Sequence, residues 1–204
     1  MKFIFPLPCL NTMHKVGIKN MVCPRCIMAV QEVLKSMMVD FERVELGQVL
    51  FEQRPDESFL RDFEEKLTAL GFSLARSRET VWVEMTKLTL IQLLEGGDMK
   101  GEAPLSDLLS SKTGLPYSRL SHLFSSMEGM SIEQYFIGLK IEKAKEWLSY
   151  ESMNISEIAW SLDYSSVQHF SAQFKKVTGL TPSQFKKLNQ KPRIFLDQVG
   201  KSPH

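Results

Sequence analysis

Two cysteines, Cys23 and Cys26, stand three positions apart in the loop formed by residues 20–26. The apolar residues after this loop recur at helical spacing, so we expect a helix from Cys26 to about Met37. Thiols at the start of a helix lie near the positive end of its dipole, which favours the thiolate. Two soft thiolates suit Cu(I), and a partner could complete a tetrahedral zinc site. The alternatives are a redox-active pair, or small residues in a domain used for contacts.

The elements that position this loop are predicted from periodicity. Val16 and Ile18 alternate with polar residues, which indicates a half-buried strand at 14–18, and two further strands, 41–46 and 49–52, flank Gly47. A helix is expected at 56–70 and a short strand at 72–74, with Gly71 as the helix stop. The apolar stripe of this helix is Phe59, Leu60, Phe63, Leu67 and Leu70. The order strand, helix, strand, strand, helix, strand is the split βαβ arrangement.

Residues 13–76 resemble the heavy-metal-associated domains of copper chaperones and metal-transport ATPases. The resemblance lies in Met21 of a Met-x-Cys-x-x-Cys loop and in the Gly71-Phe72 pair after the second helix. It implies a ferredoxin-like domain whose Cys23 and Cys26 bind Cu(I) or another soft metal ion, and hence a metal- or thiol-sensing role. Asn20 stands where the family has glycine. Met21 is expected to pack under the loop rather than bind metal.

The second half of the chain contains an internal repeat at a spacing of 50 residues. Residues 105–108 read Leu-Ser-Asp-Leu, and residues 155–158 read Ile-Ser-Glu-Ile. Gly-Met-Ser at 129–131 recurs as Gly-Leu-Thr at 179–181 in the same register. Such a repeat indicates two copies of one supersecondary unit. Ser106 and Ser156 are the expected N-caps of the first helix in each copy.

Each copy is predicted to form a helix-turn-helix, with second helices at about 117–127 and 166–177. Their buried stripes are Leu120, Leu123, Phe124 and Met127 in one copy and Phe170, Phe174 and Val177 in the other. A long helix, 132–150, joins the copies with Tyr135, Leu139, Ile141, Ala144 and Leu148 on its buried side. Such a unit can place its second helix in a major groove of DNA. The alternative is an all-helical repeat that binds protein.

Residues 105–188 also resemble the DNA-binding domain of AraC/XylS transcription regulators. The resemblance rests on Ile158-Ala159 and on residues 169–186, which include the family's Gly-x-Thr-Pro at 179–182. Asp163-Tyr164 replaces the usual Gly-Phe turn, and Lys186 replaces an arginine. By position, the resemblance assigns groove-facing roles to Ser118, Ser121, His122, Val167, Gln168, Ser171 and Ala172. We expect phosphate contacts from Lys175, Lys176, Lys186 and Lys187.

Charge and composition agree with this division of the chain. The net charge is only +1, but the segment from Ser165 onward holds seven basic residues and one acidic residue, which suits a polyanionic partner. No apolar run is long enough for a membrane span. Three cysteines, two of them paired, suit a reducing, cytoplasmic compartment. The four histidines stand apart from any nucleophile or acid pair, so we expect no enzyme activity.

The sequence therefore predicts an α+β, ferredoxin-like βαββαβ domain (13–76), a linker helix and loop (79–104), and an all-α domain with two helix-turn-helix units (105–188). The linker helix is expected to pack within the chain or to pair with a second chain. The predicted function is sequence-specific transcription regulation, with promoter DNA and RNA polymerase as partners. The alternative is a metal-trafficking protein whose helical half is a docking module. Residues 1–12 are interpreted as a leader.

Overall fold

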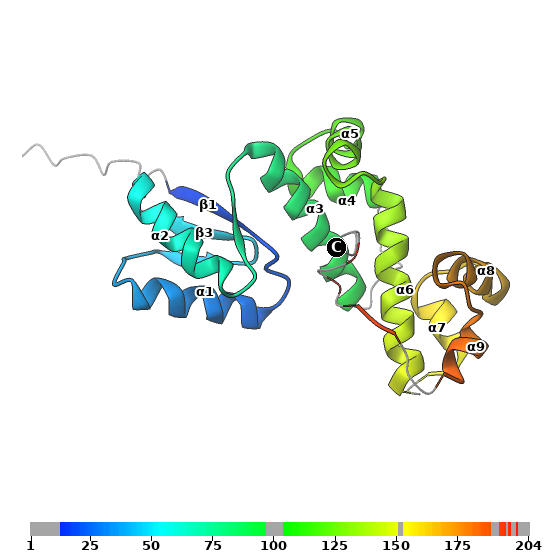
Figure 1. Ribbon diagram of the computed structural model, residues 1–204. Coiled ribbons are helices and arrows are strands. Elements are labelled where there is room, and N and C mark those ends of the chain that lie inside the picture. Colours follow the sequence, from blue (N-terminus) through cyan, green and yellow to red (C-terminus); the bar gives the residue numbers. More distant parts are fainter. Residues whose placement is uncertain are drawn as a thin grey trace, which may run out of the picture. The chain divides into compact units, whose positions relative to one another are not determined.

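The computed structural model describes residues 13–96, 104–150, 153–188, 192–194, 196 and 199. The chain divides into two compact units, residues 1–84 and 85–204, drawn from blue to red in Figure 1. The division falls inside the helix α3 (Arg78–Glu95). The predicted leader and the loop at 97–103 lie outside the described residues, and the predicted domain limits stay predictions.

The first unit is a four-stranded antiparallel sheet with two helices. Its elements follow in the order that the sequence predicted: β1 (His14–Lys19), α1 (Pro24–Ser36), β2 (Arg43–Glu45), β3 (Gln48–Phe51), α2 (Glu57–Thr68) and β4 (Ser73–Ala75). The strand order in the sheet is β2-β3-β1-β4, so β1 lies between β3 and β4. The loop with the two cysteines leaves this central strand.

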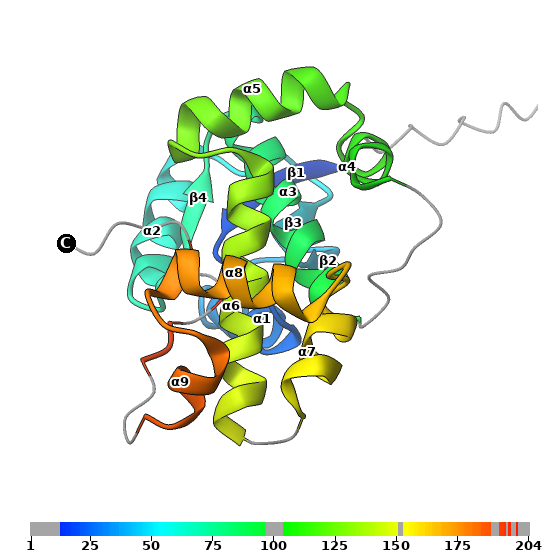
Figure 2. The same cartoon turned by 90° about the vertical axis from the view of Figure 1, so that its right-hand side faces the viewer.

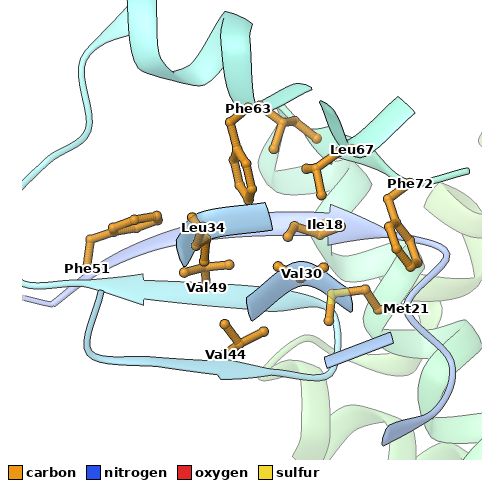
Figure 3. Packing of buried hydrophobic residues seen from close by; sticks show 11 residues of the cluster. Ile18, Met21, Val30, Leu34, Val44, Val49, Phe51, Phe63, Leu67 and Phe72 are labelled. Carbon is orange, nitrogen blue, oxygen red and sulfur yellow. The ribbon is translucent and has the colours of Figure 1, made fainter. Parts of the chain in front are cut away.

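The core of the first unit lies between one face of the sheet and the helices α1 and α2. Figure 3 shows Ile18 and Val49 from the strands facing Val30 of α1 and Phe63 of α2. The expectation that Leu70 continues the stripe of the second helix is wrong. The helix ends at Thr68, and Leu70 is half exposed because the chain has already turned away toward β4.

The other face of the sheet is covered in part by the start of α3. A Cβ atom on Gly17 would lie 2.9 Å from both Cβ of Ala75 and Cγ2 of Val81, so only glycine allows this close approach. Farther along α3, Lys87 forms an ion pair of 2.7 Å with Glu128 of α5 (Tyr117–Glu128). Both contacts show the linker helix packing within the chain.

The second unit is helical. Besides the later part of α3 and α5, it comprises α4 (Leu105–Thr113), α6 (Ile132–Tyr150), α7 (Ile155–Ser161), α8 (Val167–Thr178) and α9 (Pro182–Lys186). The residues predicted for the buried side of α6 are all buried, from Tyr135 to Leu148. Figure 2 shows α5 crossing α6 near one end and α8 crossing it farther along. Among the described residues, no helix is long and apolar enough to cross a membrane.

The spacing of 50 residues is visible in the helices themselves. The helices α4 and α7 begin at 105 and 155, α5 and α8 at 117 and 167, and α6 and α9 at 132 and 182. Both α5 and α8 have 12 residues and end at a glycine with positive φ, Gly129 (70°) and Gly179 (79°). Residues 117–136 and 167–186 also have the same order of buried, half-buried and exposed positions. The two copies therefore fold alike.

Two expectations about these helices are wrong. The N-caps are Pro104 and Asn154 rather than Ser106 and Ser156, because both helices begin two residues earlier than predicted. At Asn154 the side chain accepts from the Glu157 amide, and the Glu157 carboxylate accepts from the Asn154 amide, which satisfies both groups.

The ends of the apolar stripes were also placed wrongly. Met127 is 44% exposed and Val177 is 48% exposed, so neither belongs to the core. The two residues are equivalent positions of the repeat, in the last turn of α5 and of α8. The helical spacing of apolar residues continues through that turn, but the side chains that bury the earlier turns of α5 and α8 do not reach it.

Candidate nucleic-acid interface and cysteine loop

The helix α8 presents one polar side to solvent because its other side is fixed by aromatic packing. Phe170 and Phe174 are fully buried, and their rings meet edge to face at 5.7 Å. Phe174 meets Phe185 of α9 in the same way at 5.6 Å. On the opposite side, Gln168, Ala172 and Lys175 are exposed, and Val167 and Ser171 are half-buried. The predicted groove-facing residues thus share one face of α8.

The helix α5 likewise has a buried apolar side opposite an exposed side, but different side chains lie on the exposed side. Leu120 and Phe124 are buried, and Phe124 meets Tyr135 of α6 edge to face at 5.4 Å. Ser118 and His122 are exposed, and Ser121 is half-buried, as are their equivalents at 168, 172 and 171. Both helices therefore have an outward face that is free to approach a second molecule.

The four lysines predicted to contact phosphate all lie beside the second of these faces. Lys175 and Lys176 belong to the last turn of α8, and Lys186 and Lys187 end α9. Within the described part of the chain, none of the four forms an ion pair. The equivalent residues of the first copy are Ser125, Ser126, Phe136 and Ile137, so that copy has no cation at these positions.

The turns before the two outward helices differ. Gly114 ends α4 with φ of 71°, a conformation that glycine adopts without strain. In the second copy, Asp163 has φ of 56°. Asp163 replaces the glycine expected from the AraC/XylS resemblance, and this departure is the feature of the sequence that marks the altered turn.

Tyr164, the second residue of this altered turn, has a buried hydroxyl with no hydrogen-bond partner among the described residues. Burial raises the pKa of Tyr164 to about 12. The ammonium of Lys140 lies over the Tyr164 ring, 5.3 Å from its centre, and burial lowers the pKa of Lys140. Tyr164 also packs edge to face against the ring of His169, an exposed residue of α8, with ring centroids 5.4 Å apart.

The cysteine loop brings the two thiols together at the start of α1. Cys23 is the N-cap residue, followed by Pro24 at the first helical position. The two sulfur atoms, Sγ of Cys23 and Sγ of Cys26, lie 3.4 Å apart. The helix begins at Pro24 and not at Cys26 as predicted, because proline is tolerated in the first turn. Met21 is fully buried beneath the loop, as expected.

Asn20 connects this loop to the end of α2. It adopts φ of 67°, and its Nδ2 atom donates a hydrogen bond of 2.9 Å to the carbonyl of Gly71. A left-handed backbone suits glycine, which the resemblance to heavy-metal-associated domains would place here, and asparagine is one of the few other residues that adopt it readily. The Asn20 side chain therefore links the cysteine loop to Gly71, the residue that follows the end of α2.

The electrostatics of the thiols differ from the expectation. Burial raises the pKa of Cys26, although backbone hydrogen bonds at Val22 and Cys23 act in the opposite direction. The prediction that the helix start favours the thiolate is thus wrong for Cys26, because desolvation outweighs the backbone contribution. The described residues contain no group of three or more His, Cys, Asp or Glu side chains placed to hold a metal ion. A metal ion bound by Cys23 and Cys26 would thus have two ligands from the described residues.

The family whose model matches this chain covers part of the second unit. Residues 109–188 match the family described as "Helix-turn-helix domain". The arabinose operon regulatory protein of Escherichia coli (strain K12) is 38% identical over 69 residues, which are 34% of this chain and 24% of that protein. This region is a helix-turn-helix domain of the AraC type.

Other proteins similar to this AraC-type domain are also transcription regulators. The HTH-type transcriptional activator RhaR of Salmonella arizonae is 34% identical over 70 residues, which are 34% of this chain and 25% of that protein. The chain spans a quarter or less of the length of these relatives. The crystal structure of transcriptional regulator CdpR from Pseudomonas aeruginosa superposes with a TM-score of 0.44 and 18% identity, over 78% of this chain and 51% of that one.

Proposed function

We propose that this protein is a transcription regulator that binds specific sequences of double-stranded DNA through two helix-turn-helix units. The AraC-type match supports DNA binding by the region as a whole. The single observation that favours two binding units is the repeat itself, since α5 and α8 expose equivalent positions 50 residues apart. Two such helices can enter successive major grooves about one helical turn apart.

The side chains suggest how each helix contributes to recognition. Gln168 can form a bidentate contact with adenine, whereas Val167 and Ala172 can contact only the methyl group of thymine. Ser118, Ser121 and His122 offer short polar contacts in the first copy. The four lysines beside α8 supply phosphate contacts, which raise affinity without reading sequence. A promoter is then the ligand, with RNA polymerase as the second partner and the cytoplasm as the compartment; no enzyme activity is proposed.

Selection from a random pool of DNA duplexes tests the proposal. The full chain should enrich one motif, and a Gln168→Ala variant should enrich a motif that is relaxed at some positions but kept at others. Val177→Ala provides a control on α8, because Val177 is exposed, lies outside the predicted groove-facing residues and has no hydrogen-bonding group. Absence of any duplex binding by the folded full chain at low salt would contradict the proposal.

A second role concerns the first unit, for which we propose a ferredoxin-like domain that senses soft metal ions or thiol oxidants. The observation that favours it is the 3.4 Å separation of the two sulfur atoms in a loop of the predicted topology. Two thiolates at one loop can hold Cu(I) without a third protein ligand. The AraC-type match in the other unit favours a regulator over the alternative of a metal-trafficking protein.

Titration of Cu(I) against a competing chelator tests this second role in the full chain. The wild type should bind one ion, with an affinity that falls as pH drops because thiolate ligands must lose protons. Cys23→Ser and Cys26→Ser should each abolish binding and leave the unit folded, since the apolar core does not involve the metal. A Cys9→Ser variant is the control. Equal affinity in the variant lacking both Cys23 and Cys26 would leave the unit as a contact module.

A further inference from the structure

A groove in the second unit lies beside the predicted DNA-facing side of α8 and shares Lys176 with it. It has a volume of about 540 Å³, which is in the range of small-molecule sites. Its walls come from the start of α6, from the last turns of α8 and from a segment near the C-terminus. The lining residues used below are Ile137, Gln173, Lys176, Val177, Ile194 and Val199.

One wall of the groove is held in place by the C-terminal segment. The amide of Ile194 donates a hydrogen bond of 3.1 Å to the buried carboxylate of Glu142 on α6. A Cβ atom on Gly138 would lie 2.9 Å from Cγ1 of Val199, so glycine at this position lets Val199 pack against α6. These contacts form an apolar wall that leaves the side chains of Val177 and Ile194 half exposed. Covering such side chains is favourable.

The charge that the groove offers to a ligand is positive. Glu142 is neutralised by its ion pair with Lys145. Lys176 and Gln173 lie one turn apart on α8, and neither has a partner in the part of the chain that the structure describes. An ammonium and an amide beside apolar side chains suit a carboxylate or sulfonate attached to an apolar body.

We propose that this groove binds a small amphipathic organic anion, whose acidic group is held by Lys176 and Gln173 and whose apolar body covers Ile137, Val177 and Ile194. Lys176 lies at the border between the groove and the DNA-facing side that Lys175 occupies. A ligand that neutralises Lys176 removes one phosphate contact. It therefore weakens DNA binding, a coupling that rests on the proposed function, whereas the binding of the anion does not.

The fluorescent anion 8-anilinonaphthalene-1-sulfonate tests the site in the full chain. The wild type should bind it saturably, and Lys176→Gln should lower the affinity about tenfold or more, as expected for loss of a charged hydrogen bond. Lys175→Gln is the matched control, with the same charge change one residue away. N-phenyl-1-naphthylamine, which has the same rings without the sulfonate, should bind the wild type more weakly. Equal binding by both lysine variants, or equal binding of both dyes, would overturn the proposal.

A second pair of variants tests the apolar wall. Val177→Trp should fill the groove and abolish saturable binding, whereas Met127→Trp, at the equivalent exposed position of α5, should leave it unchanged. Loss in both variants, or in neither, would contradict the site. Thermal unfolding of each variant shows whether it is folded.

The regulatory consequence is measured separately as duplex affinity with and without the dye. The dye should weaken DNA binding by the wild type and by Lys175→Gln but not by Lys176→Gln. Unchanged affinity in the presence of saturating dye would refute the coupling. Failure of the protein to bind any DNA would instead refute the proposed function, and the dye titrations would still decide whether the groove binds an anion.

Discussion

The two copies of the repeat in the second unit share their buried side and differ in their exposed side. Positions 120 and 170, and positions 124 and 174, are fully buried in both copies. The exposed positions 125 and 175 hold serine in one copy and lysine in the other, and 118 and 168 hold serine and glutamine. Packing has thus kept the apolar positions equivalent while the outward groups diverged. Under the proposed function, the second copy would therefore supply most of the phosphate contacts and the longer base-reading side chain.

The turns that precede the two outward helices also differ between the copies. Three residues separate α4 from α5, whereas five separate α7 from α8. In the first turn, Gly114 adopts positive φ without strain. In the second turn, Asp163 adopts positive φ, and the buried Tyr164 hydroxyl has no hydrogen-bond partner in the part of the chain that the structure describes. The outward helices nevertheless begin at equivalent positions. The second copy therefore folds despite an unfavourable turn. A substitution that removes the unfavourable group should stabilise it.

The largest effect is expected from the shared buried side. Phe124→Ala and Phe174→Ala should each lower the free energy of unfolding of their unit by roughly 3–5 kcal/mol, because each leaves a cavity in a closed core. Val177→Ala, at a half-exposed position of α8, should cost much less. Urea unfolding followed by circular dichroism measures all three. A similar loss for Val177→Ala and Phe174→Ala would mean that the buried side is wrongly assigned.

The next effect concerns base reading. Gln168→Ala should reduce discrimination against the wrong base by roughly 1–3 kcal/mol if the amide makes a bidentate contact. Ser118→Ala, the equivalent change in the first copy, should cost less because a hydroxyl makes a single contact. Competition titrations with single-base variants of the selected duplex measure both. A larger loss at Ser118 would reverse the assignment of roles to the two copies.

A gain of stability is expected at the altered turn. Tyr164→Phe removes a buried hydroxyl without a partner among the described residues and should stabilise the second unit by about 1 kcal/mol. Tyr117→Phe should act in the opposite direction, because the Tyr117 hydroxyl donates a hydrogen bond to Glu133. Thermal unfolding distinguishes the two signs. Destabilisation by Tyr164→Phe would show that the hydroxyl is satisfied.

The smallest effect is expected from a single phosphate contact. Lys175→Ala should weaken binding to all duplexes alike and reduce the slope of log affinity against log salt by about 0.9. Ser125→Ala, at the equivalent position of α5, should leave the slope unchanged. Fluorescence anisotropy at several salt concentrations gives both slopes. A change of motif in the Lys175→Ala variant would indicate that this lysine contacts bases.

Periodicity and local signals predicted much of this fold. The order of elements in the first unit follows from alternation and helical spacing, and the repeat of 50 residues follows from matched short motifs such as 105–108 and 155–158. The exposure of Leu70, Met127 and Val177 was not predictable, because periodicity gives the face of a helix but not the point where its cover ends.

Features that depend on tertiary contacts could not be predicted from the sequence either. The raised pKa of Cys26 depends on how deeply the loop is buried, which the spacing of two cysteines does not reveal. The packing of Val199 against Gly138 joins residues about 60 positions apart with no sequence pattern between them. The base and phosphate contacts of the predicted site residues stay predictions until DNA binding is measured.

The central claim is that both copies contact DNA, and hydroxyl-radical footprinting of the full chain on its selected duplex tests it most directly. We predict two protected tracts on one face of the duplex, about 10 base pairs apart, as expected for helices in successive major grooves. Gln168→Ala should weaken protection mainly in one tract, and Ser118→Ala mainly in the other. A single protected tract, weakened by changes in only one copy, would contradict the claim.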